Sequence, residues 1–167
     1  KDPQDWNMNP VNISPYINNI QELRGRTKSI KIKIGLEVDF FEAEPFDEAI
    51  EFFSEETDFE LAQPETILNW LILVAAAEKI ELRHVVFIFC TDTYLHQMNV
   101  EYLKHDTLTD VITFPYATDV LEGDIFISID RVRENAASLK LDFYTELHRV
   151  MVHGVLHLCG YSDKTKE

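Results

Sequence analysis

The chain alternates short runs of β-branched and aromatic residues with stretches in which apolar positions recur at helical intervals. A helix is predicted over residues 63–80, because Pro64 stands near its start and the apolar positions are three and four apart: Ile67, Leu68, Leu71, Ile72, Ala75 and Ala76. The next segment, HVVFIFCTD at residues 84–92, is rich in valine and phenylalanine and predicts a buried strand. Alternating helices and strands of this kind indicate a layered fold.

Six further elements are predicted from residue 49 onward. AIEFFSEE, TDVITFPYA and GDIFISID have the composition of strands, at residues 49–56, 109–117 and 123–130. Pro115 interrupts the second of these, which is therefore expected to be short or to lie at a sheet edge. Helices are expected at residues 92–103, capped by Asp92 or Thr93, at 130–139 and at 142–160. The predicted fold class is α+β, a small mixed sheet with helices packed on it.

The N-terminal part of the chain differs from the rest. It begins with a polar stretch rich in asparagine and proline, followed by a short helical pattern at residues 16–29 and an alternating strand pattern at residues 29–41. An acidic segment that contains a proline comes next, at residues 42–47. We therefore expect an N-terminal extension of unknown role at residues 1–45 and one main domain at residues 46–167.

Composition limits the classes of function. The chain has 167 residues, enough for one domain with a substantial core, and a formal net charge of -15. Such acidity argues against broad, non-specific nucleic-acid binding, because neutralising phosphates requires lysine and arginine, but it leaves room for a small basic site. Cys90 and Cys159 make no disulfide framework, and no apolar run reaches the roughly 20 residues of a membrane span. We expect a cytoplasmic protein without membrane partners or a signal peptide, and the first residue, Lys1, indicates a fragment or a processed product.

The strongest chemical signal is HGVLHLCGYSD at residues 153–163. His153 and His157 are four apart on the last predicted helix, so both imidazoles lie on one helix face and can share an ion. Gly160 can take a left-handed conformation and end the helix, after which Asp163 can reach the same ion. Two histidines and one carboxylate leave a fourth position for water, which is the arrangement of a catalytic zinc. The alternative, two ordinary helix histidines and a solvated aspartate, stays open.

Gly154 argues against one class of zinc enzyme. In the usual zinc-peptidase signature a glutamate directly follows the first histidine and acts as the general base. Here that position is Gly154, which has no group to take up a proton. It belongs instead to a stripe of apolar or small residues that is expected to face the core: Leu147, Val150, Met151, Gly154 and Leu158.

Three sequence blocks, in one order, carry a resemblance to a known family. HGVLHLCGYSD is the first, Thr109 to Phe114 matches a Thr-Asp-Val-hydrophobic-Ser/Thr-Phe block, and Gly123 to Ile125 matches a Gly-Asp-Ile block. These blocks resemble the YbeY family, the metal-dependent endoribonucleases of bacterial ribosomal RNA maturation. The resemblance covers about residues 50–163.

The resemblance implies a zinc-dependent endoribonuclease that cleaves single-stranded RNA in maturation of the 16S ribosomal RNA 3′ end and in ribosome quality control. One Zn²⁺ per chain would be held by His153, His157 and Asp163; histidine is the commoner third ligand in the family, and aspartate also ligates zinc. Where many members carry an arginine, this chain offers Lys104 one position later, as a point charge for a phosphate. The implied partners are ribosomal RNA and small ribosomal subunit proteins or a ribosome-associated GTPase.

Four further residues are candidates for supporting the site. Glu146 lies two turns before His153 on its side of the helix, where it would orient a ligand or be a solvated charge. The others lie in the matched blocks and would shape a substrate loop or a helix N-terminus near the metal: Thr109, Asp110 and Asp124. For these, a purely structural role stays open.

The two ends of the chain depart from the main resemblance. Residues 16–42 resemble a stretch of PHP-type histidinol phosphatases, in which Glu37 would be a metal ligand. The chain lacks the histidine-rich motifs that such an enzyme also needs, so we assign this segment no activity. At the other end, family members continue into a further helix beyond the position of Glu167, so a C-terminal truncation is expected.

Two other classes of function stay open. A non-catalytic ribosome-assembly factor with a structural metal would bind RNA without cleaving it and would unfold when the metal is removed; the acidity of the chain favours this class. A metallohydrolase of another class, such as a peptidase, would show chelator-sensitive peptide hydrolysis.

Overall fold

The computed structural model describes residues 49–161, so the N-terminal extension with Glu37 and the C-terminal segment with Asp163 lie outside the described residues. The elements follow one another as β1 (Ile50–Ser54), α4 (Pro64–Ala77), β2 (Glu81–Cys90), α5 (Asp92–Leu103), β3 (Val111–Pro115), β4 (Val120–Ser128), α6 (Ile129–Leu139) and α7 (Phe143–Leu158). Every helix and strand predicted from residue 49 onward is confirmed, whereas the predicted helix and strand between residues 16 and 41 lie outside this range.

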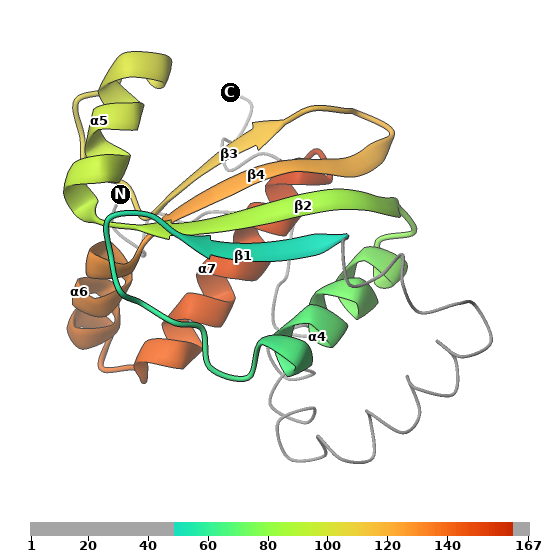
Figure 1. Cartoon of the computed structure of the whole chain (residues 1–167), viewed down its shortest axis with the longest axis horizontal. Helices are drawn as coiled ribbons and strands as arrows, with labels where there is room; N and C mark the ends of the chain where they lie inside the picture. Colours follow the sequence, from blue (N-terminus) through green and yellow to red (C-terminus); the bar gives the residue numbers. More distant parts are fainter. Residues whose placement is uncertain (1–48, 162–167) are drawn as a thin grey trace.

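The four strands form one mixed sheet in the order β1-β2-β4-β3 (Figure 1). β2 is parallel to both β1 and β4, and β3 is antiparallel to β4. Among the described strands β3 is an edge strand of five residues that ends at Pro115, as the proline predicts. The small mixed sheet of an α+β fold is therefore confirmed.

One face of this sheet carries the main core. Ile125 and Ile127 of β4 are fully buried on this face, where they join one apolar cluster with side chains of α4, α6 and α7. These three helices lie on the same side of the sheet in Figure 1. The predicted apolar stripe of α7 is buried in this cluster, with Leu147, Val150 and Met151 at 0% exposed and Leu158 at 4%. None of the helices α4 to α7 is long and apolar enough to cross a membrane.

Of the helices that the structure describes, only α5 covers the other face, at one end of the sheet (Figure 1). A second, smaller core cluster lies there, built from Cys90, Leu95 and Ile112. Aromatic side chains surround it, and Phe114 and Phe126 meet edge to face with ring centroids 5.7 Å apart. Among the described elements, this one short helix leaves part of the face uncovered (Figure 1).

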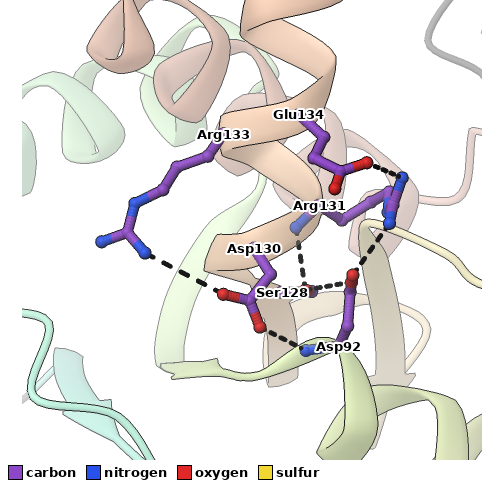
Figure 2. A network of polar contacts seen from close by, with 6 residues as sticks. All are labelled: Asp92, Ser128, Asp130, Arg131, Arg133 and Glu134. Carbon is purple, nitrogen blue, oxygen red and sulfur yellow. Dashed lines mark hydrogen bonds and ion pairs between the residues drawn. The ribbon is translucent and has the colours of Figure 1, made fainter.

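A polar network fixes the start of α5 to the start of α6 (Figure 2). Ser128 caps α6: its Oγ accepts from the backbone N–H of Arg131 at 3.1 Å and donates to Asp92 at 2.7 Å. Arg131 donates to the other carboxylate oxygen of Asp92 at 2.8 Å. In return, Asp130 of α6 accepts from the backbone N–H of Asp92 at 2.9 Å. Asp130 thus satisfies a backbone N–H at the N-terminus of α5, while Asp92 holds the Ser128 cap and the Arg131 side chain of α6 in place.

The predicted cap of α5 is wrong by one residue. The helix begins at Asp92 and is capped by Thr91, whose hydroxyl accepts from the backbone N–H of Tyr94 at 3.1 Å. Asp92, which was expected to cap, directs its carboxylate to Ser128 and Arg131 instead.

Candidate metal centre

His153 and His157 face each other on α7. Their Nε2 atoms are 2.7 Å apart and their ring centroids 4.5 Å apart. His153 is 3% exposed, and His157 is partly exposed at the surface. Both imidazoles share one helix face, as the four-residue spacing predicts.

The geometry of the two rings fits a shared ion. A separation of 2.7 Å is that of a hydrogen bond in which one neutral ring donates to the other. Two nitrogens bound to one tetrahedral zinc stand about 3.3 Å apart, so the rings would need to separate by only about 0.6 Å. Within residues 49–161 no three potential ligands come together, and the expected third ligand, Asp163, lies outside this range.

Two glycines allow α7 to approach the sheet closely. A β-carbon at Gly154 would lie 2.8 Å from Cγ2 of Ile125 on β4. A β-carbon at Gly123 would lie 2.4 Å from the carbonyl oxygen of Phe114 and 2.9 Å from Cδ2 of Leu158. Side chains do not tolerate such distances, so a larger residue at either position would push α7 and β4 apart. The depth at which the histidines lie against the sheet therefore depends on two positions without side chains.

The end of α7 reverses the direction of the chain. Gly160 has a φ of 103°, in the left-handed region that glycine adopts without a steric penalty. The N–H of Gly160 donates to the carbonyl of His157 at 3.0 Å, and the N–H of Tyr161 donates to that of Leu156 at 3.1 Å. These two bonds form a Schellman motif, so the predicted glycine-ended helix is confirmed. Asp163 comes three residues after Gly160 in the sequence.

Glu146 is not a solvated charge, because it is fully buried. Arg149 binds it with two hydrogen bonds, from Nη2 to Oε1 at 2.8 Å and from Nε to Oε2 at 3.1 Å. Such a bidentate, charge-assisted pair holds both side chains in one orientation. The pair lies on α7 between one and two turns before His153, and a role in orienting that ligand stays a prediction.

Asp110 is also buried, at 1% exposed. Burial raises the pKa of its carboxyl from 3.8 to about 7; nearby Glu146 raises it further and Arg149 lowers it. Its Oδ2 atom has no hydrogen-bond partner among the described residues, while its backbone carbonyl accepts from Ser128 at 2.9 Å. Asp110, Glu146 and Arg149 therefore form one largely buried group of interacting ionisable side chains.

The other predicted residues do not gather around the two histidines. Thr109 donates its hydroxyl to the carbonyl of Val111 at 3.3 Å, which is a local bond at the start of β3. Asp124 accepts from the hydroxyl of Tyr116, on the opposite sheet face from the α7 core. Lys104 is exposed at the end of α5, where its φ of 54° is left-handed. The functional roles of these residues stay predictions.

Asn99 has a structural role that the sequence pattern did not predict. It is 3% exposed within α5, and its Nδ2 donates to the carbonyl of Thr107 at 2.8 Å. The bond ties the loop after Lys104 back to α5. The available signal was an asparagine in a helix interior, where this residue is disfavoured without a special contact.

A groove of about 560 Å³ lies beside α5 on the accessible sheet face. Aromatic side chains of α5, β3 and β4 line it, together with three carboxylates: Glu56, Glu101 and Asp124. No lysine or arginine belongs to the described residues of its lining. The groove is therefore aromatic and anionic, and it lies on the opposite side of the sheet from α7.

Comparison with known proteins gives a consistent family. The family model described as endoribonuclease YbeY matches residues 49–167. A protein named endoribonuclease YbeY from Amoebophilus asiaticus is 51% identical over 118 residues, which cover 70% of this chain and 80% of that protein. One of the same name from Cytophaga hutchinsonii is 49% identical over 121 residues, which cover 71% and 85%. The solution structure of a Thermotoga maritima protein gives a TM-score of 0.47 at 27% identity and covers 71% of this chain and 77% of that one. The family model spans more than half of the residues of this chain and includes the helix with both histidines. This chain therefore belongs to the YbeY family of endoribonucleases.

Proposed function

We propose that this chain is a cytoplasmic, zinc-dependent endoribonuclease that cleaves single-stranded RNA in maturation of the 16S ribosomal RNA 3′ end and in ribosome quality control. One observation carries the proposal: the Nε2 atoms of His153 and His157 converge to 2.7 Å on a helix of a chain whose relatives are named endoribonucleases. Two neutral imidazole nitrogens aimed at one point are a common part of catalytic zinc sites.

In this proposal His153, His157 and Asp163 hold one Zn²⁺ per chain. A bound zinc ion would supply Lewis acidity toward a phosphate oxygen and lower the pKa of a water molecule toward ~7. The imidazoles must both be neutral to bind it, and a hydrogen bond between the two rings already requires one neutral ring. Lys104, exposed at the end of α5, would neutralise a phosphate of the substrate.

The groove beside α5 indicates which kind of partner could bind there. Its three carboxylates repel phosphates, so the RNA backbone would avoid this groove. An aromatic, anionic groove suits a cationic protein segment, through ion pairs and cation–π contacts. Small ribosomal subunit proteins, which must bind RNA themselves, have this chemistry, and a ribosome-associated GTPase is the other expected partner.

The test begins with metal content. Zinc is measured by mass spectrometry in the purified wild type, His157→Ala and Asp163→Ala, with His105→Ala as the control because His105 is exposed and has no partner at ligand spacing. We expect about one zinc per chain in the wild type and the control, and loss in the other two. Cleavage of single-stranded RNA is then expected to stop with a chelator and to resume when zinc is restored, while duplex RNA stays intact.

Two results would contradict this function. Wild-type protein without zinc, or zinc that survives Asp163→Ala unchanged, would mean that the ligand set is wrong. Zinc-loaded protein that binds RNA or ribosomal particles without cleaving them, and unfolds on chelation, would favour the assembly factor. The anionic groove supports that second function. A peptidase is less favoured, since Gly154 supplies no base.

A further inference from the structure

The outer edge of β3 carries backbone groups that point away from the sheet. At the two ends of this strand, the carbonyl of Asp110 accepts from the N–H of Ser128 at 2.9 Å, and the N–H of Tyr116 donates to the carbonyl of Glu122 at 2.9 Å. In an antiparallel pair, residues that bond to the neighbouring strand alternate with residues that direct both backbone groups outward. By this register, Thr113 directs its N–H and C=O away from β4, to a side where no described strand pairs with it.

The side chain of Thr113 lies on the sheet face that bears α7. Thr113 pairs with Ile125, which is fully buried on that face, and Val111, two residues earlier, packs against the same core cluster. Because side chains alternate between the two faces of a strand, Thr113 faces the same way, and it is partly exposed. Pro115 holds the next outward position and has no N–H. Thr113 therefore supplies the last outward N–H of β3.

The two histidines lie on the flank of α7 that is nearer to β3. On the other flank, His148 packs edge to face against Trp70 of α4, with ring centroids 5.8 Å apart. His153 and His157 follow five and nine residues later, so they are rotated from His148 by about 140° and 180° around the helix axis. α4 packs against β2, whereas α7 packs against β4 and β3. The flank that faces away from α4 is therefore the one beside the outer edge of the sheet.

Thr113 is also level with the histidines along the helix. A β-carbon at Gly154 would lie 2.8 Å from Cγ2 of Ile125, and Ile125 is the strand partner of Thr113. His153 directly precedes Gly154 in the chain. An outward N–H and a hydroxyl of one residue therefore border the space beside the converging imidazoles.

We propose that Thr113 binds a phosphate of the RNA substrate next to the metal centre, with its backbone N–H and its hydroxyl as donors. This inference rests on the proposed function. Backbone N–H groups and threonine hydroxyls commonly bind phosphate oxygens of nucleic acids, whatever the base sequence. Because a phosphate is charged, each such bond is stronger than one between neutral groups. The carboxylates of the groove beside α5 lie on the other sheet face, so they do not oppose a phosphate here.

The first experiment measures kcat/KM of the zinc-loaded full chain for cleavage of a short single-stranded RNA. Thr113→Val replaces the hydroxyl by a methyl group, and we expect kcat/KM to fall about tenfold, the loss for one hydrogen bond to a charged group. Thr113→Ser keeps the hydroxyl and should stay within about twofold of the wild type. The control is Thr118→Val, at an exposed position between β3 and β4, which should equal the wild type. Zinc content and melting temperature should not change in any of the three.

A modified substrate tests whether the partner of Thr113 is a phosphate. Each linkage around the cleaved bond is replaced in turn by an uncharged methylphosphonate. At one linkage, we expect the wild type to lose about tenfold in kcat/KM. On that RNA, Thr113→Val should cause no further loss, because both changes remove the same hydrogen bond.

Two proline variants test the backbone donor. Thr113→Pro removes an outward N–H and leaves the bonds to β4 intact, so its melting temperature should fall little while its kcat/KM falls below that of Thr113→Val. Ile112→Pro removes an N–H that bonds to β4, so its melting temperature should fall clearly. If the two prolines destabilise the protein equally, the N–H of Thr113 points to β4 and the proposed geometry is refuted.

The possible failures are distinguishable. A zinc-loaded wild type that does not cleave RNA would refute the proposed function and the role of Thr113 with it. A wild type that cleaves RNA, with unchanged kcat/KM in Thr113→Val, would overturn the role of Thr113 alone. The same follows if Thr113→Val loses equally on every methylphosphonate RNA, since no single phosphate would then be its partner. Loss of zinc in Thr113→Val would also overturn this role, because the residue would then support the metal.

Discussion

Replacing Asp110 by asparagine is expected to stabilise the protein at neutral pH and to change little near pH 4. Burial raises the pKa of the Asp110 carboxyl from 3.8 to about 7, so the fold favours the protonated, neutral form. The stability contributed by this neutral form is complete below pH 3.8 and is lost as the pH rises toward 7. Asparagine has almost the same shape and cannot ionise, so the variant retains that stability at every pH.

The expected size follows from the same two pKa values. One pH unit corresponds to about 1.4 kcal/mol. The interval from 3.8 to about 7 therefore corresponds to about 4 kcal/mol in the free energy of unfolding. Solvent screening removes little of this, because the side chain is 1% exposed. The asparagine also loses the attraction of the charged carboxylate to Arg149, which makes 4 kcal/mol an upper value.

The assay is urea unfolding of the metal-free protein at several pH values from 4 to 8. The difference in unfolding free energy between Asp110→Asn and the wild type should grow from pH 4 to about pH 7. Above that pH the difference should stay constant. Asp119→Asn, at an exposed position, is the matched control and should follow the wild-type curve. If the curves of Asp110→Asn and the wild type run parallel over this range, the carboxyl is charged in the folded state and the argument from burial is refuted.

Three other substitutions test the packing and the loops. Gly123→Ala should lower the free energy of unfolding by about 3 kcal/mol, because the new β-carbon would meet the backbone oxygen of Phe114 at 2.4 Å and neither strand can yield easily. Ser128→Ala removes the cap of α6 and its bond to α5, and should lower the same quantity by about 1–2 kcal/mol. Asn99→Ala releases Thr107, so amide hydrogen exchange in the loop at residues 104–109 should become faster while that of α7 stays unchanged.

Each of these has a contrary outcome. Ser138→Ala, at an exposed position of the same helix as Ser128, should change the unfolding free energy by only a few tenths of a kcal/mol; equal effects of the two would mean that the cap contributes nothing. A Gly123→Ala protein as stable as the wild type would show that the two strands can separate at little cost. Uniformly faster exchange in Asn99→Ala would indicate a global loss of stability and no local anchor.

The sequence predicted those features that depend on neighbouring positions. Apolar spacing of three and four identified α4 and the buried stripe of α7, because the side chains that share a helix face are close in sequence. The pairing of His153 with His157 was predictable for the same reason. Pro115 marked β3 as a short edge strand, since a proline cannot donate to a second neighbouring strand.

Features that depend on distant partners could not be predicted in this way. Asp92 has the chemistry of a helix cap, but its carboxylate turns to Ser128 and Arg131, whose positions follow from the pairing of β2 with β4. The helical spacing of Glu146 does not predict its burial, because the same spacing is compatible with an exposed charge. The aromatic groove requires β3 and β4 to be side by side, so no single segment encodes it.

The close contact of Gly154 with the sheet limits the chemistry that this helix could acquire. The glutamate base of a zinc peptidase would have to occupy position 154. A β-carbon there would already lie 2.8 Å from Cγ2 of Ile125. In a peptidase this direction leads to the reacting water, whereas here it leads into β4. A Gly154→Glu chain should therefore misfold before it could gain peptide hydrolysis. To change the catalytic class, the helix would need a new register against the strand, which no single substitution can provide.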